Sequence, residues 1–298
     1  MTDGGHGHDG TPGADPAAPL SAWQLLDVAA VLGLLTIAAG YACALLLSRV
    51  RTPWPAHRTA AWLLGLACAG AALVGPLAAA ARESFTAHMA AHLLLGMVAP
   101  LLLVLGAPVT ALLRALPVRG ARAVSRVLRS LPVRVVTHPF VAASLVGGGL
   151  WVLYATPLLA LSHASPVVHT AVHGHTLLAG YVLTASVAGR DPDPHRASPA
   201  VRTAALVLVS AAHAVLARHL VGHPPADVTP EDARVGAQLM SYGSDVVDVV
   251  LLVLVAAGWY VAGGHRAGTG SRRVAPSRHP YDDGRASARP DARRAAGG

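Results

Sequence analysis

Seven apolar segments, each about as long as a bilayer-spanning helix, constrain the fold of this chain more than any other feature. A helix needs about 20 apolar residues to cross the hydrocarbon core of a membrane. The segments lie near residues 23–48, 59–81, 88–112, 139–161, 167–187, 201–221 and 236–261. Charged residues make up 13% of the chain, about half the share that is usual in soluble domains. The sequence therefore predicts an all-α membrane protein, a seven-transmembrane helix bundle.

The regions around the bundle differ from it in composition. Residues 1–22 are rich in Gly, Pro and Asp, and residues 262–298 are rich in Arg, Gly, Ala and Pro; we expect both tails to be disordered. The membrane domain then covers residues 23–261. Within it, the stretch near 116–134 carries arginines at helical spacing with Val and Leu between them, which predicts an amphipathic helix at the membrane surface.

The arginines predict the orientation. The chain has no lysine, so all 23 of its basic residues are arginines, and its formal net charge is +8. Twenty lie in the 49–58, 113–138 and 188–202 connections and in the C-terminal tail, whereas only Arg82, Arg218 and Arg234 fall on the other side. By the positive-inside rule, the N-terminus is outside and the C-terminus is cytoplasmic. This distribution indicates contact with lipid headgroups and not with nucleic acid.

Histidines gather in the outer halves of the predicted spans. His88 and His92 lie one helical turn apart at the start of the third span, His169 and His173 are spaced alike in the fifth, and His213 lies in the sixth. Ionisable groups are costly at membrane depth and face the interior of a bundle or a water-filled cleft. These five histidines therefore predict a functional site near the outer leaflet.

Carboxylates extend this expected site. In the seventh span, Gln238, Ser241, Asp245 and Asp248 share one continuous helix face. Asp27 and Asp245 are candidates to orient the second ring nitrogen of a histidine ligand. Interhelical hydrogen bonding is the alternative role for the polar face of the seventh span. His175 points some 120° away from the His169/His173 face, as helical geometry requires.

The residue types favour a metal site. Imidazole suits copper, zinc, iron and nickel, and copper(I) also accepts thioethers such as those of Met97 and Met240. Two histidines on facing helices could instead bind a haem, and membrane histidines and aspartates can also relay protons. The sequence HMAAH at 88–92 lacks the glutamate of a HExxH metalloprotease, and we expect a protein that is not an enzyme.

The order and spacing of several short motifs resemble one family, the CtaG-type cytochrome c oxidase assembly factors in their actinobacterial form. The strongest part is HMxxH at 88–92, followed by Met97, Pro100 and GAPVTALLRALP at 106–117. The remaining matches are His138-Pro139, Trp151, Tyr154, Thr156-Pro157, His169, His175, Gly180-Tyr181, GRDPDP at 189–194, His213, Asp232, Gly236, Met240 and Asp245. In the last motif Ala233 and Ser241 replace the usual Gln and Trp, and Asp245 stands where Glu is usual.

This resemblance implies a plasma-membrane protein needed to build an active haem-copper oxidase, with oxidase subunits as partners. We expect copper to bind at His88, His92, His169, His173 and His213, supported by Asp245, for delivery to the oxidase. The alternatives are a membrane protein of copper transport or homeostasis, and a haem-binding membrane protein. The family pattern favours His175 as the partner of His169, whereas helical geometry favours His173. The oligomeric state is left open.

Overall fold

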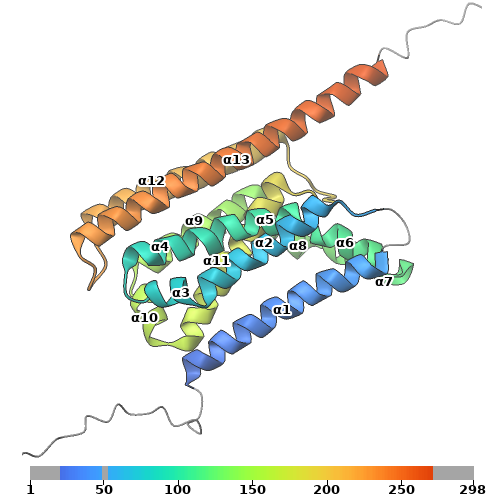
Figure 1. Cartoon of the computed structure of the whole chain (residues 1–298). Coiled ribbons are helices and arrows are strands. Elements are labelled where there is room, and N and C mark those ends of the chain that lie inside the picture. The colour runs from blue at the N-terminus through green and yellow to red at the C-terminus, as the bar shows by residue number, and fades with distance from the viewer. Residues whose placement is uncertain (1–20, 49–52, 271–298) are drawn as a thin grey trace, which may run out of the picture. The chain divides into compact units, whose positions relative to one another are not determined.

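The computed structural model describes residues 21–48 and 53–270, and every ordered element in those ranges is a helix (Figure 1). The chain divides into two compact units, residues 1–257 and 258–298. The elements are α1 (Ala22–Ser48), α2 (Ala56–Leu73), α3 (Pro76–Ala80), α4 (Phe85–Leu93), the π-helix η1 (Leu94–Val98), α5 (Ala99–Leu105), α6 (Pro108–Ala115), α7 (Val118–Leu128), α8 (Leu131–Val136), α9 (Pro139–Ala155), α10 (Leu158–Ala164), α11 (Pro166–Ala188), α12 (Pro199–Gly222) and α13 (Pro230–Gly270).

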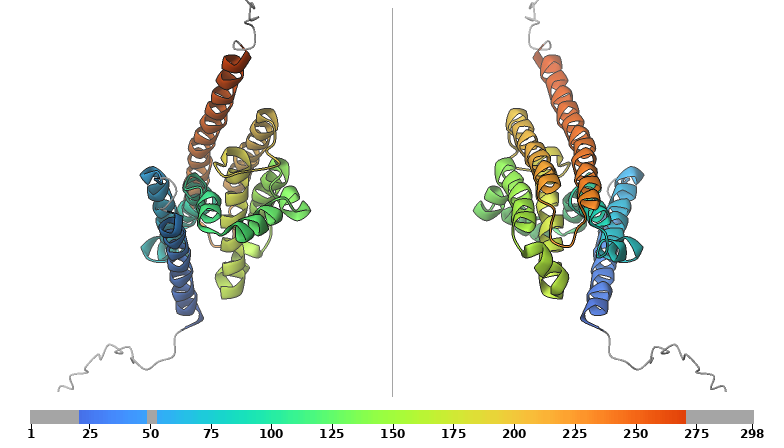
Figure 2. Two further views of the ribbon diagram at one scale, coloured as in Figure 1. Left: turned by 90° about the vertical axis from the view of Figure 1, so that its right-hand side faces the viewer. Right: turned by 90° about the vertical axis from the view of Figure 1, so that its left-hand side faces the viewer.

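The membrane character that the sequence predicts is confirmed. Within the described residues, five helical stretches are long and apolar enough to cross a bilayer, and the bent pair α9 and α10 raises the number to six. The five are Ala22–Ser48, Ala56–Ala80, Phe85–Leu105, Pro199–Gly222 and Pro230–Tyr260. α11 has 23 residues, but its three polar histidines keep it outside this set. The outer α1, which lies beside α2 and α6 (Figure 2), exposes many leucines, as expected of a helix in contact with lipid.

Three predicted segments differ in detail. The third span ends at Leu105 and not near 112, because Gly106 and Ala107, the latter with φ 50°, interrupt the helix. The amphipathic segment near 116–134 forms two short helices, α7 and α8. Of the tails, residues 262–270 continue α13, while 1–20 and 271–298 lie outside the described residues.

The fourth predicted span is bent by 78° between α9 and α10. The cause lies at Thr156, which adopts an extended conformation (φ −128°, ψ 169°), because the ring of Pro157 disfavours a helical residue before it. The bend places α10 beside the start of α11.

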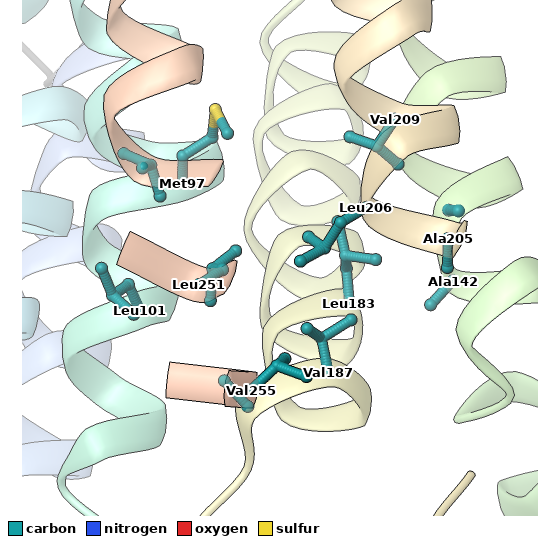
Figure 3. Packing of buried hydrophobic residues seen from close by; sticks show 13 residues of the cluster. Met97, Leu101, Ala142, Leu183, Val187, Ala205, Leu206, Val209, Leu251 and Val255 are labelled. Carbon is teal, nitrogen blue, oxygen red and sulfur yellow. The ribbon is translucent and has the colours of Figure 1, made fainter. Parts of the chain in front are cut away.

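A core of small and aliphatic side chains joins five of the long helical stretches (Figure 3). Met97 and Leu101 from η1 and α5 face Leu251 and Val255 from α13, and the middle of the core is filled from α9, α11 and α12. The histidines described below lie beside this core, and Met97 belongs both to the core and to a cavity that histidines line.

The π-helix η1 follows directly after the His88/His92 pair. Pro100 has no N–H to donate to the carbonyl of Gly96, so an α-helical ladder cannot continue unbroken here. The Ala99 N–H instead bonds to Leu94, five residues back. A Cβ on Gly180 of α11 would overlap the Gly96 carbonyl oxygen, so glycine at 180 lets α11 approach the irregular segment at backbone distance.

Two aspartates cap helices that are distant in sequence. Asp232 at the start of α13 accepts hydrogen bonds from the Phe85 N–H (2.7 Å) and the Thr86 N–H (3.0 Å), at the start of α4. Asp191 accepts in the same way from Thr110 N–H (2.7 Å) at the start of α6. The first N–H groups of a helix lack partners within it, so each aspartate stabilises a helix end and ties two parts of the chain together.

Asp232→Ala is expected to lower the free energy of unfolding by about 1–2 kcal/mol, the usual cost of losing a helix cap. The neighbouring Glu231→Ala is the matched control, because Glu231 is exposed and its ion pair is with the exposed Arg234 on the same helix. Thermal unfolding of the purified protein in detergent should show a lower midpoint for Asp232→Ala alone. Equal midpoints for the two variants would contradict the capping role.

Candidate functional site

Three histidines from two helices border a small cavity of about 20 Å³. α4 supplies His88 and His92, and α11 supplies His173; the remaining walls are apolar except for Thr176. The Ser84 hydroxyl and Asp232 fix the start of α4, so that both histidines of the pair turn toward α11. A cavity of this size holds about one water molecule. We call it the small histidine cavity.

A chain of polar contacts holds His88. Its Nε2 lies 3.1 Å from the hydroxyl of Tyr154 on α9, and that hydroxyl donates to the sulfur of Met89 at 3.8 Å. In the tautomer with its proton on Nε2, His88 donates to Tyr154 and Nδ1 keeps its lone pair; in the other tautomer Nε2 accepts from the tyrosine hydroxyl. The His163 ring on α10 lies 5.8 Å from that of His88.

His173 is oriented by its own helix. Its Nδ1 donates to the carbonyl of His169 at 2.9 Å, which leaves Nε2 with a lone pair. The two rings stack with centroids 4.0 Å apart, and His169 also meets the edge of Trp23 at 5.3 Å. His169 lines neither the small histidine cavity nor the larger one beside it.

His92 also lines a second, larger cavity of about 460 Å³, together with Met97, His175 and His213. His213 Nδ1 donates to the Val209 carbonyl at 3.0 Å, and His175 Nε2 donates to the Leu145 carbonyl at 3.1 Å. Gly149 on α9 makes room for His175, since a Cβ there would overlap its Nε2. The structure therefore places His173 with the His88/His92 pair, and His175 and His213 in the adjoining space.

The expected carboxylate partners lie outside the two histidine cavities, although the charge of Asp245 acts on His213. Asp245 borders a separate cavity between α12 and α13, with Asp248 and Ser210. Asp27 is about half-exposed and lies 3.9 Å from Arg82. Neither aspartate lines either histidine cavity. Asp245 is turned toward α12.

No three His, Cys, Asp or Glu side chains in residues 21–48 and 53–270 converge closely enough to hold a metal ion. Of the small-cavity histidines, His88 and His173 have hydrogen bonds that fix their rings. The ring of His92 makes no hydrogen bond to any of the described residues. Of these three rings, that of His92 is therefore the most able to turn.

Sequence reasoning did not assign Tyr154 to the site, although Tyr154 belongs to the motif after Trp151. Nor did it identify Asp191 and Asp232 as caps. Both aspartates stand close to prolines at helix boundaries, at Pro192 and Pro230. A carboxylate in such a place was the one available signal of a capping role.

The fold and its buried imidazoles define a class: a helical membrane protein that spans the bilayer several times and encloses a histidine-lined interior. Within this class, the chain belongs to the cytochrome c oxidase caa3 assembly factor family (Caa3_CtaG), whose family model matches residues 39–262. The resemblance seen in the sequence motifs is thereby confirmed.

The chain is similar to uncharacterized mycobacterial proteins. Those of Mycobacterium bovis and Mycobacterium tuberculosis are each 34% identical to it over 208 residues, which cover 66% of this chain and 31% of theirs. One from Mycobacterium leprae is 28% identical over 260 residues, covering 79% of this chain and 39% of its own. The chain thus spans about a third of the length of these relatives. No solved structure matches it.

Proposed function

We propose that this protein takes part in assembling a haem-copper cytochrome c oxidase by holding copper at His88, His92 and His173 and passing it to an oxidase subunit. The observation that carries the proposal is the small histidine cavity, a space of about 20 Å³ that three imidazoles border. Copper is the cargo in this account, and the protein's role is not catalytic.

The donor set fits copper. Imidazole is a good ligand for copper in either oxidation state, and it binds metals in the neutral form through a nitrogen with a free lone pair. His173 keeps such a nitrogen because its Nδ1 donates to a carbonyl, and His88 keeps one in the tautomer that donates to Tyr154. Groups that orient a ligand in this way typically strengthen metal binding.

Binding requires a rearrangement at His92. Since the described side chains do not form a three-ligand set, the His92 ring must turn toward the cavity that it borders. The site that forms contains no thiolate, and imidazole ligands exchange more readily than a closed thiolate cage. A site of this kind suits transient storage and release.

Topology supports delivery from the outer side of the plasma membrane. If the bent pair α9–α10 and the histidine-bearing α11 are both spans, the protein has seven transmembrane spans. The arginine distribution then puts the N-terminus outside. The start of α4 and the start of α11 then lie in the outer leaflet. Copper would reach the site, and leave it for the oxidase, without crossing the whole bilayer.

Deletion of the protein is expected to lower both the activity and the copper content of the haem-copper oxidase in membranes of its host. The wild-type gene should restore both, and His138→Ala, outside the two histidine cavities, should do so equally well. His88→Ala/His92→Ala should fail although it is inserted at normal levels. Oxidase with a full copper content in the deletion strain would contradict the delivery role.

A further inference from the structure

The larger cavity is mostly apolar, and some of the side chains that line it are exposed. Its walls come from α4, η1, α9, α10, α11 and α12, and aliphatic side chains form most of its surface. Val152 and Val167 lie at its margin and are 53% and 77% exposed, on helices whose outer surfaces face hydrocarbon in a membrane protein. A volume of about 460 Å³ is in the range of pockets that bind small molecules.

One histidine that lines this cavity has a buried ring nitrogen without a partner in the described part of the chain. His213 is 1% exposed, and its Nε2 is buried without a hydrogen bond among the described residues. Its Nδ1 faces the Val209 carbonyl, and a carbonyl can only accept, so Nδ1 carries the proton. Nε2 is therefore an acceptor that is shielded from water and has no hydrogen-bond donor, which is costly in a protein interior.

We propose that this cavity binds a lipid-phase molecule with an apolar body and a hydroxyl group, and that the hydroxyl donates its hydrogen bond to His213 Nε2. The apolar walls match the body, the exposed Val152 and Val167 lie where lipid would meet the cavity, and the unpaired Nε2 of His213 supplies the acceptor once its ring turns slightly toward the occupant. This site is additional to the copper site and does not rest on it.

Other occupants satisfy these features less well. A lipid acyl chain would fill the apolar volume but offers no donor to His213. A buried water needs two to four polar partners, which a mostly apolar wall supplies poorly. A metal ion alone would use the lone pair of Nε2 but would leave most of the volume empty.

A matched pair of probes tests the proposal. The full chain is placed in lipid nanodiscs, and the binding of farnesol is compared with that of farnesyl methyl ether, which has the same isoprenoid body and no donor. We expect farnesol to bind about tenfold more tightly, the ratio that one hydrogen bond of ordinary strength provides. In His213→Phe this ratio should fall to about one.

A second pair of variants tests the location. Ala171→Trp fills the cavity from an exposed position on α11, while Leu178→Trp adds the same side chain at an exposed position outside it. Farnesol binding should be lost only in Ala171→Trp, with the unfolding midpoint of both variants near that of the wild type. Equal affinity for alcohol and ether, or farnesol binding that survives in Ala171→Trp, would overturn the proposal. Copper binding that is unchanged in Ala171→Trp keeps this outcome separate from the proposed copper role.

Discussion

Gly180→Ala should destabilise the protein by about 3 kcal/mol or more, or prevent its folding, which is among the largest effects of adding a methyl group to a packed interior. The new Cβ would overlap the backbone carbonyl of Gly96. A flexible side chain could swing away, but this carbonyl belongs to η1, whose course Pro100 dictates. The strain would have to move α11 away from α4 and η1, and the histidines of α11 with it.

Gly174→Ala is the matched control. It lies on the same helix, and a Cβ there meets nothing within 4 Å. Because alanine favours helix more than glycine by about 1 kcal/mol, this variant should be as stable as the wild type or more so. The midpoints of thermal unfolding in one detergent compare the two. If the Gly180→Ala protein were as stable as the Gly174→Ala protein, the close packing of α11 against η1 would be contradicted.

His173→Ala should weaken copper binding far more than His175→Ala. His173 borders the small histidine cavity with His88 and His92, whereas His175 lines the larger cavity. Removal of a residue that only hydrogen-bonds to a metal ligand can lower metal affinity 10–100-fold. The loss of a direct ligand should therefore lower copper affinity at least about tenfold. Titration of the purified variants with copper against a competing chelator measures the difference.

The opposite order would be informative. If His175→Ala lost copper and His173→Ala kept it, the metal would sit in the larger cavity, with His92, Met97 and His213. The small histidine cavity would then have only a structural role. That result would also agree with the family pattern, which favours His175 as the partner of His169.

Much of the bundle follows from segment length and composition. Helix starts at Pro139, Pro166, Pro199 and Pro230 agree with the preference of proline for the first turn. Most ends of the long apolar segments lie within a few residues of the predicted ones, the exceptions being the end of the third span and the start of the seventh. The bend at Thr156 and the π-helix before Pro100 have sequence causes as well, but a hydropathy profile averages over single prolines and conceals them.

The interior of the site was harder to predict. Helical spacing shows that His88 and His92 share a face, but not which neighbouring helix that face meets. Rotation of α13 about its axis directs Asp245 toward α12, outside the two cavities that the histidines line. That rotation depends on packing contacts such as Gly243 against Leu93, and these contacts join residues about 150 positions apart.

Hydrogen bonds from histidines to backbone carbonyls could likewise not be predicted from the sequence. The lone pairs left on His173 and His213 depend on the carbonyls of His169 and Val209, and any helical histidine can make or lack such a bond. Asp27 shows the reverse case: the sequence made it a plausible partner of a histidine, and the fold places it beside Arg82.

The copper content of the purified protein tests most directly whether the His88/His92 pair binds copper. The full chain and its His88→Ala/His92→Ala variant are purified from copper-replete cells, and copper and iron are measured per protein together with the absorption spectrum. We expect about one copper per wild-type protein, almost none in the variant, and no haem band in either. Wild-type protein without copper, or a variant that retains it in full, would contradict the proposal that this histidine pair binds the metal.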